Sequence, residues 1–236
     1  MLPTIYYYYP MKRFYPLIFI FLLLACGKDP DLLPDQEVRR VLILGNSITH
    51  HQPAPEIGWY GSWGMAASAS EKDYVSILRN SLQQIYPDVE VTTRIMVDFE
   101  RGFWDYDFGN MADLQGMDPD ILIWRLAENI TETDFNTYDL AGAAEQVVTL
   151  IRNKPEMRVI FTTTFWGPDQ LNIEMKRIAQ KNGWELVDLY PLGFEEKYRA
   201  IGKFENEGVA IHPGDLGMQK IANMIFDQIK NCHACK

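Results

Sequence analysis

Ser47 is the strongest candidate for a nucleophile because it closely follows a short aliphatic run. Residues 41–44 (VLIL) have the composition of a buried parallel strand, and Gly45 lets the chain turn tightly where that strand ends. A serine at this point lies at the mouth of the sheet, where the following peptide N–H groups can face a developing anion. The alternative is that Asn46 or Ser47 only caps a helix. An isolated GNS favours capping, so the serine needs a partner elsewhere in the chain.

A nucleophilic serine needs a base, and histidine is the usual one. The sequence has four histidines. His233 lies in the tail, and His50 and His51 follow Ser47 too closely to reach back across its hydroxyl, although they could line the site. His212 remains, on a loop that precedes the last predicted helix. The alternative for His212 is a helix-capping or surface histidine.

The elements that must position these two residues are predicted by alternating apolar runs and amphipathic segments. Strands are expected at 41–44, 89–97, 121–124, 159–161 and 186–189, and helices at 73–85, 140–151, 173–182 and 217–229. This alternation predicts a parallel sheet covered by helices on both faces, with sites at the carboxyl ends of the strands. Ser47 and His212 are therefore expected at the same edge of one sheet.

The chain resembles the SGNH hydrolases, a branch of the GDSL-type esterases and lipases, in three motifs that occur in the family's order. The first is GNS at residues 45–47, with asparagine where many members have aspartate. The third block of the family, Gly-x-Asn-Asp, resembles residues 127–130 (AENI), in which only the asparagine is retained. The fifth resembles residues 212–217 (HPGDLG). Together the motifs cover residues 41–229.

The resemblance implies a fold and a set of roles. The fold is a three-layer α/β/α domain with a flavodoxin-like parallel sheet. Ser47 is then the nucleophile, His212 its base, and Asn129 the side-chain donor of an oxyanion hole that also uses the Ser47 N–H. A turn asparagine is the alternative for Asn129. Neither a metal nor an organic cofactor is implied.

Two departures from the family bear on activity. The second block supplies a glycine N–H to the oxyanion hole, and the corresponding stretch, residues 97–102, offers Gly102 or another backbone N–H. The acid of the triad, three residues before the histidine, is replaced by Val209. Glu207, Asp215 or a backbone carbonyl must then hold the imidazole. Loss of this charge in a serine protease costs ~10⁴-fold in rate, so either a substitute exists or the activity is weak.

Two loops rich in aromatic residues follow the first and second strands, at 58–63 (GWYGSW) and 103–106 (FWDY). Both are expected near the site, where aromatic rings would stack on sugar faces. Packing in the core is the alternative for each ring, and we expect it for about half of them. These loops favour a glycan ester as substrate.

The net charge of −10 and the pI near 4.9 argue against nucleic acid as a partner. The tail at residues 232–236 contains Cys232 and Cys235, which either form a disulfide or belong to a frayed end. A metal site with His233 lacks a fourth ligand at zinc-like spacing, and the order of residues does not match the c-type haem motif.

The N-terminal 25 residues have the pattern of a secretory signal. Residues 11–13 are the start of a basic region, and the apolar run at 15–25 is shorter than the ~20 residues that span a bilayer. The run ends in LLAC, which resembles the bacterial lipobox, so Cys26 is expected to be lipidated. An apolar helix that happens to end in cysteine is the alternative. The first ten residues fit no signal pattern, which leaves Met11 open as the start of translation.

The remaining chain then divides into a polar, lipidated tether at residues 26–38, an esterase domain at 39–231, and the tail. This organisation predicts an exported, membrane-anchored lipoprotein, periplasmic or at the cell surface, held to the membrane only by its lipid. The oligomeric state is left open.

The function expected from these features is a serine esterase that hydrolyses carboxylic esters through an acyl-enzyme. O-acetyl groups on a polysaccharide are the first choice of substrate, and acyl-chain esters are the second. A glycan-binding lipoprotein on a catalytically weak or inactive scaffold is the main alternative, because Val209 replaces the acid. A metal-dependent hydrolase that uses His50 and His51 lacks a convincing third ligand.

Overall fold

The computed structural model describes residues 1, 3, 4 and 37–231, and residues 37–231 belong to one compact unit. Its centre is a five-stranded sheet in the order β2-β1-β3-β4-β5, and every pairing is parallel. The strands are β1 (Arg40–Gly45), β2 (Glu90–Ile95), β3 (Ile121–Arg125), β4 (Arg158–Thr162) and β5 (Glu185–Val187). The predicted flavodoxin-like order is thereby confirmed.

Helices connect successive strands. They are α1 (Tyr74–Gln83), α2 (Val97–Gly102), α3 (Glu132–Thr137), α4 (Leu140–Ile151), α5 (Asp169–Asn182), α6 (Glu207–Ala210) and α7 (Asp215–Asn231). Short 3₁₀ turns are η1 (Pro55–Ile57), η2 (Ser70–Lys72), η3 (Phe108–Leu114), η4 (Tyr190–Phe194) and η5 (Glu196–Tyr198). Among the described residues, no helix combines the length and the apolar character needed to cross a membrane.

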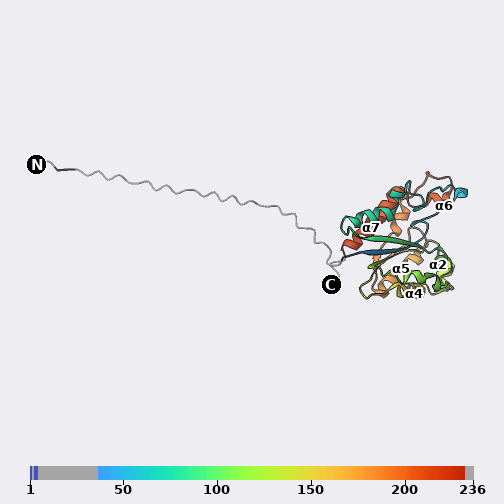
Figure 1. Ribbon diagram of the computed structural model, residues 1–236. Coiled ribbons are helices and arrows are strands. Elements are labelled where there is room, and N and C mark those ends of the chain that lie inside the picture. Colours follow the sequence, from blue (N-terminus) through green and yellow to red (C-terminus); the bar gives the residue numbers. More distant parts are fainter. Residues whose placement is uncertain (2, 5–36, 232–236) are drawn as a thin grey trace. The chain divides into compact units, whose positions relative to one another are not determined.

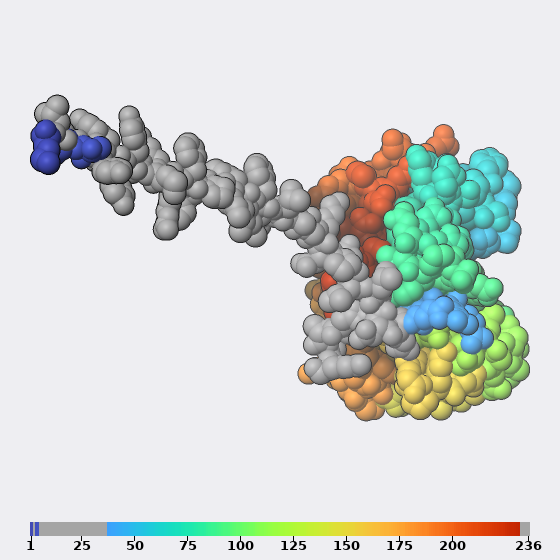
Figure 2. Space-filling view, turned by 60° about the vertical axis from the view of Figure 1, so that its left-hand side comes forward, coloured from blue at the N-terminus to red at the C-terminus, as the bar shows by residue number. Residues whose placement is uncertain are grey.

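Helices cover both faces of the sheet because alternate residues of each strand point to opposite sides. Leu42 and Leu44 of β1 pack with residues of α4 and α5, whereas Val41 and Ile43 pack with residues of α1 and α7. Figure 1 shows α7 on one side of the sheet and α4 and α5 on the other. In Figure 2 the red surface of α7 lies beside the green surface around α1, and the two helices contact each other.

Short polar residues and glycine set the ends of the main helices. The Asp73 carboxylate accepts the Ser76 N–H at 2.7 Å and begins α1, and Asp139 accepts the Gly142 N–H at 2.9 Å and begins α4. Gly183 ends α5 in the left-handed conformation, with φ 64°. These local signals fix where the chain leaves each helix to enter the next strand.

The expected and observed elements differ at two places that matter for the site. The β-rich segment predicted to reach residue 97 stops at Ile95, and Val97 begins the short helix α2. The last strand ends at Val187 because the Thr163 hydroxyl accepts the N–H groups of the next turn, those of Leu189 (2.7 Å) and Tyr190 (2.9 Å). The sheet is therefore shorter at this edge, and loops begin earlier.

Several sequence-based expectations fall outside the described residues. These are the signal at 1–25, the lipidation of Cys26 and the pairing of Cys232 with Cys235. Val38, the last residue of the expected tether, is buried and packs in the same cluster as Val41 and Ile43 of β1.

Candidate active site

Ser47 and His212 meet at the carboxyl end of β1. The Ser47 Oγ lies 2.9 Å from the His212 Nε2, although 165 positions separate them in the sequence. Ser47 follows β1 by two residues, and His212 lies between α6 and α7. The distance is within the 2.6–3.2 Å range of a nucleophile hydrogen-bonded to its base.

A backbone carbonyl, and neither carboxylate considered above, faces the other nitrogen of His212. The His212 Nδ1 lies 2.7 Å from the Gly208 carbonyl oxygen. Because a carbonyl only accepts, Nδ1 carries the proton and Nε2 presents its lone pair to the Ser47 hydroxyl. Glu207 is exposed at the start of α6, and the Asp215 carboxylate instead accepts hydrogen bonds from Ser68 and Lys72.

The contact with Gly208 is a helix cap as well as a constraint on the imidazole. Gly208 belongs to the single turn α6, and the last carbonyls of a helix find no N–H donor within the helix itself. His212, four residues later, uses Nδ1 to satisfy one of them. The capping role and the contact with Ser47, which sequence reasoning treated as alternatives, thus coexist in one side chain.

Burial keeps His212 neutral. The side chain is 7% exposed, and the Trp166 ring packs edge-on with its centroid 4.7 Å from that of the imidazole. Burial lowers the pKa of His212 to about 4, the Gly208 hydrogen bond opposes this shift, and the nearby His51 and Arg125 add to it. At neutral pH the imidazole is therefore in the form that can accept a proton.

The turn after β1 depends on a missing side chain. A Cβ at Gly45 would collide with the side chain of Thr49, whose hydroxyl bonds the buried Tyr74 hydroxyl at 2.6 Å. The N–H groups of Thr49 and His50 both donate to the Asn46 carbonyl, at 2.9 and 3.0 Å. Glycine therefore permits the tight turn that places Ser47 at the sheet edge.

Asn129 lines the same pocket as Ser47 and His212, and a buried carboxylate fixes its amide. The Asn129 Nδ2 donates to Glu100 Oε2 at 2.5 Å. An amide nitrogen carries two hydrogens, so one bond to Glu100 leaves a second N–H for another acceptor. Glu100 comes from α2 and is fully buried.

Glu100 also holds the backbone that leads to Asn129. The Ala127 N–H donates to Glu100 Oε1 at 2.5 Å, and Ala127 has a φ of 107°, in the region that favours glycine. The family motif has glycine at this position. Alanine adopts this backbone conformation at a cost, so a strong acceptor for its N–H helps to hold it there. The Oε1 atom of Glu100 supplies one.

A second carboxylate lies beside Glu100 beneath the site. Glu128 Oε1 accepts from Arg125 Nη1 at 2.6 Å, in an ion pair whose side chains are 0% and 1% exposed, and from the Phe165 N–H at 2.7 Å. Burial, and then the charge of Glu128, raise the pKa of Glu100 to about 7. Two carboxylates and one arginine therefore share a nearly dry space.

Asn46 joins the two carboxylates, which explains the asparagine in the first motif. Its Nδ2 donates to Glu100 Oε1 at 2.9 Å and to Glu128 Oε2 at 2.6 Å. An aspartate here would place a third negative charge against Glu100 and Glu128, whereas the amide supplies donors. The departure from the common aspartate follows from these neighbours.

Sequence reasoning missed Glu100, Arg125, Glu128 and Gly208. For the first three a signal existed, because each is an ionisable residue within or next to an apolar run, where a charge persists only if it is paired. The role of the Gly208 carbonyl left no such trace, since a backbone group has no residue type.

The pocket around Ser47 has a volume of about 240 Å³. The described residues that line it are Ser47, His51, Ile57, Met65, Val97, Arg101, Asn129, Asn206, Gly208, Val209 and His212. Gly102, considered above as a backbone donor, is the last residue of α2 and is not part of this lining, whereas Val97 at the start of α2 is. In Figure 1 both α2 and α6 lie on the right-hand side of the domain.

The aromatic loops divide between core and surface. Trp59 is buried and packs against Trp63 and Phe204, whereas Tyr60 is exposed. Trp104 is exposed and stacks on Tyr138. None of the described residues lining the pocket is aromatic except for the imidazoles.

The other two described histidines make different contacts. His51 lines the pocket and its Nδ1 lies 2.6 Å from the Gln52 carbonyl, and His50 Nε2 lies 3.3 Å from the Ser62 hydroxyl. Within residues 37–231, no three His, Cys, Asp or Glu side chains gather closely enough to hold a metal ion.

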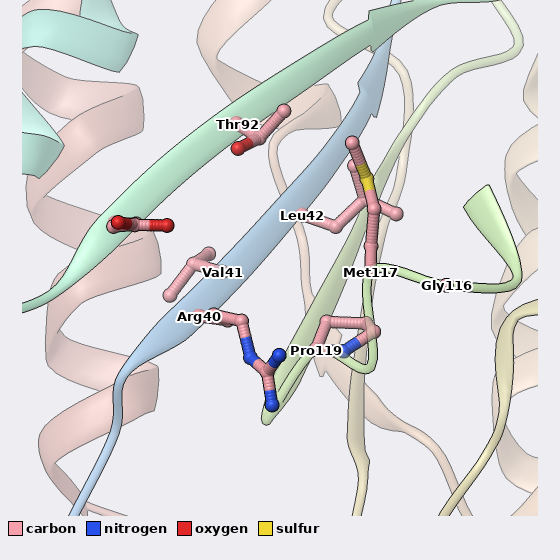
Figure 3. A pocket seen from close by; sticks show the side chains of 8 residues that line it. Arg40, Val41, Leu42, Thr92, Gly116, Met117 and Pro119 are labelled. Carbon is pink, nitrogen blue, oxygen red and sulfur yellow. The ribbon is translucent and has the colours of Figure 1, made fainter. Parts of the chain in front are cut away.

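A second pocket, of about 230 Å³, lies beside the first residues of β1 and β2 (Figure 3). Its walls include Arg40, Leu42, Thr92, Met117 and Pro119. Arg40 is paired with Asp118 at 2.7 Å. The described lining of this pocket holds no serine, cysteine or histidine, so the pocket offers no pair comparable to Ser47 and His212.

Several solved structures are similar to this chain over most of its length. A two-domain esterase (CEX) active on acetylated mannans is 22% identical, with a TM-score of 0.50, and the match covers 83% of this chain and 50% of that one. The acetyl xylan esterase AlAXEase is 15% identical, with a TM-score of 0.53 and coverage of 80% and 99%. A protein described as a GDSL-like lipase, from Parabacteroides merdae, is 17% identical, with a TM-score of 0.51 and coverage of 82% and 96%.

The chain spans about half the length of the two-domain esterase that it matches. A scan against models of protein families gives no match, and a search of the curated proteins gives none either. The structural matches establish the fold, which is that of the SGNH hydrolases, as the sequence motifs predicted.

Proposed function

We propose that this protein is a serine esterase that removes O-acetyl groups from a polysaccharide. The observation that carries the proposal is the hydrogen-bonded pair of Ser47 and His212, 2.9 Å apart, in one pocket with Asn129. A nucleophile, a neutral base and an amide donor around one cavity are the groups that acyl transfer requires. The fold, shared with esterases, adds support.

The reaction starts with the neutral imidazole. As the Ser47 Oγ bonds to the ester carbonyl carbon, its proton passes to His212 Nε2, and the carbonyl oxygen becomes an oxyanion. Collapse of this intermediate breaks the bond to the sugar oxygen, which takes the proton from Nε2. Water then repeats the sequence on the acyl-enzyme, so that acetate leaves and Ser47 is restored.

The oxyanion is held by Asn129 and by backbone groups. The second N–H of Asn129 is directed by the bond of the first to Glu100. The Ser47 N–H and the N–H of Val97, which begins α2 and has no acceptor within that helix, complete the hole. Donors set before the reaction stabilise the charge without reorganisation.

The pocket favours a short acyl group on a glycan. A volume of about 240 Å³, with Ile57, Met65 and Val97 as apolar walls, accommodates an acetyl group with part of a sugar better than a long acyl chain. Two similar structures are of an esterase active on acetylated mannans and of an acetyl xylan esterase. A glycan ester is therefore the substrate class we propose.

Activity assays on purified protein test this proposal. The wild type should hydrolyse nitrophenyl acetate and release acetate from acetylated glycans, and Ser47→Ala and His212→Ala should each abolish both reactions. Because the two side chains act as a unit, the double variant should be little worse than either single one. Ser81→Ala, on α1, is the matched control. A Ser47→Ala variant with full activity would leave the glycan-binding alternative.

We further propose export and lipid anchoring, supported by the basic start, the apolar run at 15–25 and the sequence LLAC that ends at Cys26. Metabolic labelling with a fatty acid should mark the wild type and not Cys26→Ser, which should leave the membrane fraction. Wild-type protein that is unlabelled and fractionates as soluble would refute the anchor.

A further inference from the structure

One cation in the wall of the active-site pocket, Arg101, has no partner among the described residues. Arg101 is exposed and lines the pocket with Ser47, Asn129 and His212. Its guanidinium makes no ion pair or side-chain hydrogen bond within the described part of the chain, whereas most other described arginines do. Acidic side chains outnumber basic ones in this chain, which has a net charge of −10, and yet this arginine beside Ser47 stays unpaired. We therefore ask which anion it could bind.

The acids close to Arg101 in sequence do not supply that anion. The adjacent Glu100 is buried and accepts hydrogen bonds from Asn46, Ala127 and Asn129 instead. Asp98 stands three residues before Arg101 on α2, a spacing at which side chains on a helix meet, and Asp105 stands four residues after it, beyond the end of α2. Both are exposed, and neither forms an ion pair with Arg101. Asp and Glu are also missing from the described lining of the pocket. Among the described residues that line the pocket, none therefore carries a negative charge opposite Arg101.

Arg101 belongs to a stripe that leads out of the pocket. Val97 and Arg101, four residues apart on α2, both line the pocket. Phe103, which follows α2, keeps a helical conformation, and Trp104 comes three residues after Arg101, the spacing at which side chains on a helix are neighbours. Along the chain, Arg101 therefore stands between the pocket-lining Val97 and the exposed ring of Trp104.

Trp104, three residues after Arg101, is one of two stacked rings. Trp104 stacks on Tyr138 with ring centroids 4.3 Å apart and planes 12° from parallel, and the two residues are 41% and 40% exposed. Two stacked rings that keep this much exposure form a platform for a flat, weakly polar surface. The C–H face of a sugar ring matches the negative face of such rings.

We propose that the substrate is an acidic glycan, in which Arg101 binds the carboxylate of a uronic acid beside the acetylated position and the Trp104–Tyr138 pair stacks on a neighbouring sugar. This inference rests on the proposed esterase function and specifies its substrate class. An arginine suits this role because its planar fork binds a carboxylate through two parallel hydrogen bonds. The carboxylate of such a substrate would also neutralise the positive charge of Arg101 in the pocket wall.

Binding measurements test the inference without any turnover. Calorimetry compares trigalacturonate with α-1,4-galactotriose, which has the same linkage and lacks the carboxylates. We expect the wild type to bind the acid roughly ten- to hundredfold more tightly, the range of a charged hydrogen-bonded contact. Arg101→Gln should remove this preference. Lys220→Gln, which removes an exposed cation on α7, is the control and should retain it.

The aromatic half of the inference has its own variant. Trp104→Ala should weaken both trisaccharides by a similar factor, because stacking does not depend on the carboxylate. Equal affinity of the wild type for both ligands, or an Arg101→Gln variant that still prefers the acid, would overturn the carboxylate site. Unchanged binding in Trp104→Ala would overturn the platform.

Assays with nitrophenyl acetate separate this inference from the proposed function. A wild type that hydrolyses this ester and shows no preference for the acid refutes the acidic substrate and leaves the esterase intact. A wild type that prefers the acid and hydrolyses no ester refutes the esterase and leaves a binding site for acidic glycans. Both results are read on the same full-length protein.

Discussion

The two sides of the Ser47 hydroxyl use charge in opposite ways. On the base side, His212 faces a neutral carbonyl, that of Gly208, at 2.7 Å. On the oxyanion side, Asn129 faces the carboxylate of Glu100 at 2.5 Å, and Glu128 with its arginine lies just behind. Val209 stands where the family has the acid that holds the base, while the Glu100 carboxylate holds the Asn129 amide, which we propose as an oxyanion donor.

This difference indicates which groups are fixed in place before the reaction begins. A carbonyl fixes the orientation and the tautomer of the imidazole but gives little stabilisation to an imidazolium, whereas a carboxylate gives both. The Glu100 network fixes both the Asn129 amide and the strained backbone at Ala127. We therefore expect a site that relies on a rigid oxyanion hole more than on a strong base.

The largest effect should come from restoring the family's acid. Val209 is buried with Trp59, Met65 and Ala200, so the carboxylate in Val209→Asp would enter an apolar cluster. An unpaired buried charge should destabilise the fold by about 3–5 kcal/mol, as measured by urea unfolding. The loss should grow as the pH rises and the carboxylate ionises.

Val209→Asn is the matched control for this change, because it is polar, similar in size to aspartate, and does not titrate. Its destabilisation should be independent of pH. A Val209→Asp protein with wild-type stability and faster turnover would mean that position 209 can reach the imidazole, which would break the contrast between the two sides.

The next effect tests the oxyanion side directly. Removing one donor from an oxyanion hole costs ~10²–10³-fold in turnover. Asn129→Ala should therefore lower kcat by about this factor, with KM little changed, because the donor acts on the transition state. Asn223→Ala, at an exposed site on α7, is the control. An unchanged rate would remove Asn129 from the chemistry.

Glu100→Gln should lower the rate less than Asn129→Ala does. One acceptor oxygen cannot serve both Asn129 and the Ala127 N–H as the carboxylate does, so we expect kcat to fall on the order of tenfold, less than for loss of the donor itself. The binding of the glycan product should not change. A variant with normal kcat would show that Glu100 does not position Asn129.

The stability of Glu100→Gln depends on pH in a defined direction. The pKa of Glu100 is raised in the folded protein to about 7, so the folded state holds its proton more tightly than the unfolded chain. Its contribution to stability is full below pH 4.5 and is lost as the pH rises through 7. The melting temperature of the variant should therefore rise relative to that of the wild type as the pH increases from 5 to 8 (about the range in which this group titrates).

The smallest effect is the position of the acid limb of activity. With the pKa of His212 lowered to about 4 by burial, kcat/KM should hold to near pH 5 and fall below it. The same shift makes the stability contribution of His212 present above pH 6.5 and progressively lost as the pH falls, so circular dichroism must accompany the assay. An acid limb of kcat/KM with its midpoint near pH 6.5 would instead indicate an anion beside the imidazole.

Much of the fold was predictable because it depends on patterns of apolar residues. The runs at 41–44 and 121–124 and the helix at 140–151 lie within one residue of their observed ends. The short helix α2 was not predicted, because its six residues contain too few turns to show a helical period. Yet α2 supplies Glu100, Val97 and Arg101 to the site.

The candidate site was predictable where a residue type carries the chemistry. Ser47, His212 and Asn129 lie together as the motifs suggested. The partner of His212 was left among three choices because the geometry of a one-turn helix decides it. The network around Glu100, the partner of Asn129, depends on the joint burial of Glu100, Glu128 and Arg125, and no spacing in the sequence reveals that.

The central claim is that His212 activates Ser47, and covalent labelling tests it most directly. A fluorophosphonate reacts only with an activated serine, so intact-mass and peptide mass spectrometry should find one adduct on Ser47 of the wild type. Ser47→Ala should remain unlabelled, and His212→Ala should react far more slowly, while Ser81→Ala should react like the wild type. Labelling of Ser47 at the same rate without His212, or no adduct on Ser47 at all, would contradict the account.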